Sequence, residues 1–156
     1  MVQMINMMDY KLIDSLDASV YWKDLSGKYL GCNKYMEKMA GLSRNQIIGN
    51  TDYFLPWKDQ AHIFQQIDRL VIDKCEKYEV EERPLINNGT YKTYLSSKSP
   101  LINENGKIIG IIGVSIDVTD NKKFKQDEEV IDKNQNSSEF LKNKNNNTEY
   151  IISNTN

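Results

Sequence analysis

The stretch GKIIGIIGVSIDVTD, Gly106–Asp120, decides how this chain folds. Its β-branched residues favour an extended backbone. With a period of two, apolar side chains fall on both faces: Ile108, Ile112, Val114, Ile116 and Val118 on one, Ile109, Ile111, Ser115 and Asp117 on the other. Apolar residues on both faces predict a central strand that is covered on both sides. Gly110 and Gly113 predict positions where a helix, a ligand or another backbone comes close.

Length, charge and cysteine content limit the class of protein. The 156 residues suit a single domain, and 20 basic against 22 acidic residues give no positive excess for binding nucleic acid or an anionic membrane. Cys32 and Cys75 lack the spacing of a metal site or a disulfide scaffold. The first 17 residues contain neither a basic start nor a long apolar run. We therefore expect a cytoplasmic protein without a membrane span.

Local patterns predict three regions along the chain. Residues 1–13 form a flanking helix, residues 14–121 a folded domain, and residues 122–156 a polar tail rich in Asn and Lys that is partly helical and then disordered. Within the domain, Asn33 is the expected N-cap of a short helix. The other expected elements are a hairpin over 20–32, a long helix over 58–75, and strands within 76–84, 90–102 and 106–119.

Three segments carry a family resemblance. They are VYWKDLSGKYLGCN, AGLSRNQIIGNTDYFLPW and YLSSKSPLINENGKIIGIIGVSIDVTD. Their motifs and the order of the expected elements resemble a PAS domain over about residues 14–123, and are similar to the N-terminal sensory modules of bacterial sensor histidine kinases. The resemblance implies an α+β fold, in which short helices and one longer helix cross one face of a five-stranded antiparallel sheet.

The resemblance also implies a function in bacterial signal transduction. The module would bind a small ligand or a partner protein and transmit the change through its last strand and flanking helices. Asp117 and Thr119 stand where this strand ends, and they would either fix the angle of the departing chain or simply cap the strand. We expect a homodimer, from an apolar N-terminal stripe and the outer positions Ile109 and Ile111, and a signalling partner acting in trans.

Eight residues are candidates for lining a ligand pocket. Aromatic and aliphatic side chains at these spacings are also typical of an ordinary core, so both interpretations stay open. Charged residues of the strands, in contrast, are expected on a solvated face, with Glu79 or Glu81 paired to Lys92 or Lys98. The pocket candidates are Tyr53, Trp57, Phe64, Ile67, Tyr78, Tyr94, Ile112 and Val114.

No cofactor is required by the sequence, and no metal site is expected. His62 on the long helix is a weak candidate for a haem ligand, because its neighbours differ from the pattern of haem-binding PAS domains. Cys32 lies in the wrong element for a flavin-based light sensor and is expected to be a small core residue. A redox or gas sensor with haem or flavin therefore remains an alternative, as does a structural dimerisation module without ligand.

Catalytic motifs are also missing from the sequence. The chain contains no phosphate-binding loop, no serine–histidine–aspartate set, no phospho-accepting histidine region and no ATP-binding domain. We expect a protein without enzymatic activity of its own, similar only to the sensor part of a kinase.

Overall fold

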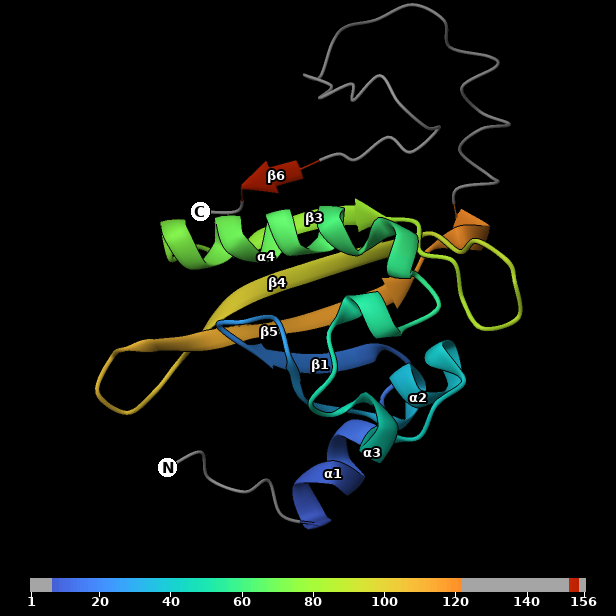
Figure 1. Cartoon of the computed structure of the whole chain (residues 1–156), viewed down its shortest axis with the longest axis horizontal. Helices are drawn as coiled ribbons and strands as arrows, with labels where there is room; N and C mark the ends of the chain where they lie inside the picture. Colours follow the sequence, from blue (N-terminus) through green and yellow to red (C-terminus); the bar gives the residue numbers. More distant parts are fainter. Residues whose placement is uncertain (1–6, 122–151, 155–156) are drawn as a thin grey trace, which may run out of the picture.

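The chain forms one antiparallel sheet with helices on one face (Figure 1). The structure is a computed structural model that describes residues 7–121 and 152–154. The strands are β1 Ser19–Asp24, β2 Tyr29–Cys32, β3 Tyr78–Glu82, β4 Tyr94–Ile102, β5 Ile108–Asp117 and β6 Ile152–Asn154, in the order β2-β1-β5-β4-β3-β6. The helices are α1 Met7–Asp14, α2 Lys34–Ala40, α3 Arg44–Ile47 and α4 Ala61–Lys74, with single 3₁₀ turns at Asp52–Phe54 and Lys58–Gln60. The α+β fold with five principal strands is as predicted.

Strand β5 occupies the centre of the sheet, which confirms the prediction from its sequence. It pairs with β1 on one side and with β4 on the other. A Cβ atom on Gly110 would overlap the backbone carbonyl of Lys23, and one on Gly113 would overlap the ring of Tyr21. Both glycines therefore stand where a neighbouring strand comes close.

The two faces of β5 differ, and here the prediction of burial on both sides is wrong. The inner face carries Ile111, which is 1% exposed in the core beneath α4, and Ser115. The outer face carries Val114 and Ile116, residues that are 36% and 51% exposed. Ile111 is therefore not the outer position that we expected it to be.

The helical layer begins with a well-capped turn at Asn33. Its buried side chain accepts hydrogen bonds from the backbone N–H groups of Met36 at 3.2 Å and Val20 at 3.0 Å, which confirms the predicted N-cap. The same helix ends at Gly41 in the left-handed conformation (φ 68°), which glycine adopts without strain. These bonds fasten α2 to β1 and fix one wall of the interior.

The C-terminal residues add a short strand to the sheet. Ile152–Asn154 forms β6 and pairs antiparallel with β3, at a place in the chain where we expected disorder. The helical part of the predicted tail lies outside the described residues. Among residues 7–121 and 152–154, no helix has both the length and the apolar character needed to cross a bilayer.

Candidate ligand site

The strand register places two unusual rows of residues on the inner face of the sheet. In one row, Lys98 of β4, Gly113 of β5 and Tyr21 of β1 lie side by side. In the next row, Ser96, Ser115 and Ser19 follow one another across the same strands, and all three are buried. Because serine and glycine have little bulk, these rows leave room between the sheet and the helices.

A network of buried charges borders this room, and Lys23 of β1 forms its first half. The Nζ atom of Lys23 donates to Asp52 Oδ2 at 2.6 Å and to Asp68 Oδ2 at 2.7 Å. The other oxygen of Asp52 accepts from the Tyr29 hydroxyl at 2.6 Å and from Trp57 Nε1 at 3.0 Å. Asp52 is thus held by three donors from three parts of the chain.

Lys98 of β4 forms the second half of the network. Its Nζ atom donates to Asp68 Oδ1 at 3.2 Å, so Asp68, on α4, bridges the two lysines. Nζ also lies 2.7 Å from Glu82 Oε1, at the end of β3. This approach lacks the geometry of a hydrogen bond, and within the described residues Glu82 Oε1 is a buried oxygen without a hydrogen-bond donor.

Electrostatics favour the ionised form of the central groups. Burial alone would raise the pKa of Asp68, but the ammonium groups of Lys98 and Lys23 outweigh it and hold that pKa below its ordinary value. Burial likewise works against charged Lys23 and Lys98, and the carboxylates of Asp68, with Asp52 or Glu82, hold their pKa values above the ordinary one. The network is therefore a set of mutually dependent charges, and removing one member leaves its neighbours with fewer partners in a buried setting.

The network has an excess of negative charge. We name Lys23, Asp52, Asp68, Glu82 and Lys98 the inner charge network; its two ammonium groups face three carboxylates, a formal charge of −1. The nearby Tyr21 side chain lines the same space, and burial raises its pKa to about 12. Tyr21 is therefore a neutral hydroxyl beside the charges.

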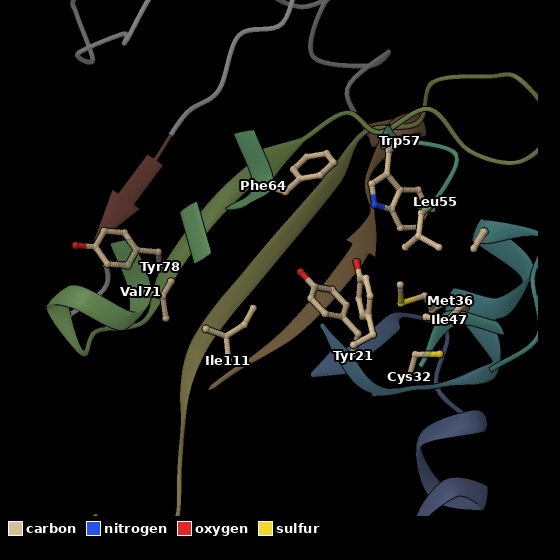
Figure 2. Packing of buried hydrophobic residues seen from close by; sticks show 12 residues of the cluster. Tyr21, Cys32, Met36, Ile47, Leu55, Trp57, Phe64, Val71, Tyr78 and Ile111 are labelled. Carbon is tan, nitrogen blue, oxygen red and sulfur yellow. The ribbon is translucent and has the colours of Figure 1, made fainter. Parts of the chain in front are cut away.

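A small cavity of about 30 Å³ lies between the network and the helices. This volume is enough for about two waters, since one water needs about 10–15 Å³. Figure 2 shows Tyr21 rising from the sheet on the side where Phe64 and Trp57 lie. The lining consists of Ser19, Tyr21, Lys23, Tyr29, Met36, Met39, Asp52, Trp57, Phe64, Glu82, Pro84, Lys98 and Ser115.

The structure brings together only part of the predicted pocket. Trp57 and Phe64 line the cavity. Ile67, Tyr78 and Tyr94 are buried but are not among the lining residues. The other three lie elsewhere: Tyr53 is 54% exposed, and Ile112 and Val114 belong to the outer face of β5.

Charged residues are what sequence reasoning missed, and the expected solvated pairing is wrong. Lys98 is buried against Asp68 and Glu82, and Lys92 pairs with Asp117 instead of Glu79 or Glu81. The alternation of side chains along β1 could have indicated that Lys23 is buried. Lys23 lies two residues after Tyr21, so both side chains point to the same face of the strand.

The end of β5 is tied to the start of β4 by polar contacts. Asp117 Oδ2 accepts from Lys92 Nζ at 2.8 Å, and Asp117 Oδ1 accepts from the Thr119 backbone N–H at 3.0 Å. Thr119 Oγ1 in turn accepts from the Thr93 backbone N–H at 3.0 Å. Asp117 and Thr119 therefore join the end of β5 to the residues just before β4.

The two residues weighed as cofactor ligands do not face the cavity. His62 is exposed on α4, and Cys32 is buried beside α2, where burial raises the pKa of its thiol to about 11. Neither residue lines the cavity. Among the described residues, no group of His, Cys, Asp and Glu side chains has the arrangement of a metal site.

Comparison with known families identifies the fold. The PAS fold family matches residues 13–123, most of the chain. The chain belongs to the PAS fold family. It is thus a PAS sensory domain, as its sequence motifs predicted.

Two curated relatives of this PAS domain are signalling proteins. A diguanylate cyclase of Vibrio cholerae is 30% identical over 111 residues, which cover 70% of the chain and 35% of the relative. The methanogenesis regulatory histidine kinase FilI of Methanothrix harundinacea is 25% identical over 111 residues, covering 71% of the chain and 12% of the relative. The chain thus spans about a third or less of the curated relatives that it matches.

Solved structures show the same fold. The VqmA dimer of Vibrio cholerae is 27% identical with a TM-score of 0.69, and the match covers 78% of this chain and 56% of VqmA. VqmA bound to DPO is also 27% identical, with a TM-score of 0.67 and coverage of 72% and 57%. A PAS domain from Colwellia psychrerythraea is 24% identical with a TM-score of 0.61, covering 70% of this chain and 93% of that one.

Proposed function

We propose that this PAS domain is the sensor of a signalling system and binds a small molecule in the cavity beside the inner charge network. The observation that carries the proposal is the cavity's lining, in which apolar side chains stand beside polar and charged groups. Phe64 and Met36 supply apolar surface, while the Tyr21 hydroxyl and Glu82, whose Oε1 atom accepts no hydrogen bond in the described structure, supply polar groups. A pocket of this mixed character is typical of small-molecule sites. The similar protein VqmA was solved bound to DPO, which supports the same use of the fold.

We further propose that ligand binding in the cavity affects the end of β5 through one row of paired residues across the sheet. Glu82 pairs with Tyr94 across β3 and β4, and Tyr94 pairs with Asp117 across β4 and β5. A ligand that moves Glu82 would press on Tyr94, next to the contacts of Asp117 and Thr119. The direction of the departing chain would then depend on whether the cavity is filled.

Native mass spectrometry tests the binding proposal. The purified chain is incubated with a small-molecule extract of microbial cells, desalted and measured under non-denaturing conditions. We expect a retained molecule in the unsubstituted chain and its loss in Phe64→Trp, which fills the cavity. Tyr53→Trp is the matched control, because the Tyr53 side chain is exposed. Equal retention by both variants, or no retained molecule in any of the three proteins, would contradict the proposal.

A second proposed function is dimerisation through the outer face of the sheet. Leu95 of β4 is 44% exposed and pairs across the strands with Ile116 of β5, and Val114 lies two residues before Ile116 on the same face. Exposed apolar side chains gathered in this way are typical of protein interfaces. The similar protein VqmA was solved as a dimer, which favours a second copy of this chain as the partner.

A further inference from the structure

The charge balance of the cavity restricts what it can bind. The inner charge network carries a formal charge of −1, and it is enclosed by apolar and aromatic side chains that exclude solvent. Placing an anion there would add a second unbalanced charge in a poorly solvated interior, which is costly. A ligand that carries a positive charge, or at least N–H donors, would instead balance the network.

One carboxylate oxygen that accepts no hydrogen bond indicates where such donors would bind. Glu82 is 7% exposed, and its Oε1 atom accepts no hydrogen bond in the described structure although Lys98 Nζ lies 2.7 Å away. In contrast, both oxygens of Asp52 and of Asp68 already accept from protein donors. Glu82 is therefore the carboxylate of the network that has capacity for a ligand.

The lining also limits the size of the ligand. About 30 Å³ suits a group of only a few atoms, and Met36 and Met39 on the helical side are the flexible side chains that can yield to something larger. On the sheet side, Ser19 and Ser115 are too small to obstruct a flat group that rests on the strands. Tyr21, whose side chain ends in a neutral hydroxyl, lines the cavity together with these serines.

We propose that the cavity selects compact cationic or N–H-bearing ligands, protonated amines and amidines above all, whose N–H groups donate to Glu82, and that it rejects carboxylates. The proposal rests on the ligand-binding function proposed above and names the chemical class of its ligand. Asp52 and Asp68 hold the two lysines in place, so that Lys23 and Lys98 cannot turn toward an anion without breaking the network.

Three probes of matched shape test this selectivity. Acetamidine is a cation, acetamide is neutral and acetate is an anion, and each has four non-hydrogen atoms. Titration into ¹⁵N-labelled protein, followed by amide chemical shifts, should show saturable changes at Tyr21 and Ser115 with acetamidine. Because a tenfold change in Kd corresponds to about 1.4 kcal/mol, an unpaired buried charge should weaken acetate relative to acetamidine by about tenfold or more.

Variants of β3 assign the effect to Glu82. Glu82→Gln should weaken acetamidine binding by about tenfold or more, since the amidinium would then donate to a neutral amide oxygen instead of a carboxylate. Glu79→Gln is the matched control on the same strand, where the side chain is partly exposed on the outer face, and it should change nothing. The comparison of probes in the unsubstituted chain needs no variant, so it stands even if Glu82→Gln fails to fold.

The outcomes separate this inference from the proposed function. Acetate binding as tightly as acetamidine, or acetamidine binding that Glu82→Gln leaves unchanged, would overturn the inference. Failure of all three probes to bind at millimolar concentration would also overturn it. If the extract experiment nevertheless yields a retained anion, the sensor function stands and only the ligand class is wrong.

Discussion

The two faces of the central sheet each carry residues of an unusual kind: charged side chains are buried within the inner face, and large apolar side chains are exposed on the outer face. The inner face, covered by helices, holds Lys23, Lys98 and Glu82 in a network of ion pairs. The outer face presents exposed Val114 and Ile116. A core of apolar residues alone would be easier to stabilise, because burying charges costs free energy unless each one is paired. Charges that are retained inside at this cost point to a function at the inner face, and apolar residues left outside point to a partner.

Neutralising Asp68, the carboxylate that bridges the two lysines, should cause the largest loss of stability among these variants. Asp68→Asn leaves each lysine with one of its two carboxylates, so we expect a loss of about 3 kcal/mol of unfolding free energy, at the low end for a broken buried pair. Urea unfolding followed by circular dichroism measures it. The matched control on the same helix is Asp73→Asn, which changes an exposed carboxylate and should cost under about 0.5 kcal/mol. Equal losses in both variants would mean that the inner charges are not paired.

Gly113 tests how tightly the inner face is built. A Cβ on this residue would overlap the Tyr21 ring, so Gly113→Ala should push the ring into the cavity and cost about 2 kcal/mol of stability by overpacking. Acetamidine binding should weaken at the same time. The same unfolding experiment, with the titration described above, measures both effects. A stable variant that binds the probe normally would show that the ring and the cavity are independent.

Acid should weaken the inner network in a defined direction. The pKa of folded Asp68 lies below its ordinary value of 3.8, so its stabilising contribution is present above that value and is lost as the pH falls through the folded pKa. The difference in unfolding free energy between the unsubstituted chain and Asp68→Asn should therefore shrink below about pH 4. Unfolding midpoints at pH 7, 5, 4 and 3 measure this. A constant difference across the series would contradict an ionised Asp68.

The smallest effect on stability is expected on the outer face. Ile116→Ser removes apolar surface that is half exposed, so unfolding free energy should change by under about 0.5 kcal/mol. If the outer face joins two copies, the same change should weaken the dimer in analytical ultracentrifugation. Tyr53→Ser, an exposed aromatic residue away from β5, is the control and should leave the assembly unchanged. A dimer unaffected by Ile116→Ser would show that the outer face is not the dimer interface.

Most of the fold was predictable because it depends on local patterns. The central place of β5 follows from ten residues of β-branched and small side chains, and the N-cap at Asn33 follows from one side chain at the start of a helix. The period of two in β5 correctly predicted that its side chains alternate between two faces, but it did not predict which face is exposed to solvent. That depends on where the helices lie, and one strand does not contain this information.

The candidate site was harder to predict because it depends on contacts between distant residues. Lys23 and Asp68 are 45 positions apart, and Lys98 and Asp68 are 30 apart. A lysine within a strand is normally assigned to a solvated face, since lysine is rarely buried without a partner. The partners here come from α4, from the 3₁₀ turn Asp52–Phe54 and from the end of β3, so the buried pairing emerges only from the tertiary structure. Trp57 and Phe64 were identified because they are apolar, and the charged half of the lining was not.

The most direct test of a charged, ligand-accessible interior is NMR of the lysine side-chain ammonium groups in the ¹⁵N-labelled chain at neutral pH. Ammonium groups held by buried carboxylates exchange their protons slowly with water, whereas exposed ones exchange rapidly. We predict two protected ammonium signals, from Lys23 and Lys98, and a shift of the Lys98 signal when acetamidine is added. Rapid exchange at every lysine, or protected signals that acetamidine leaves unmoved, would contradict the assignment of this interior as a ligand site.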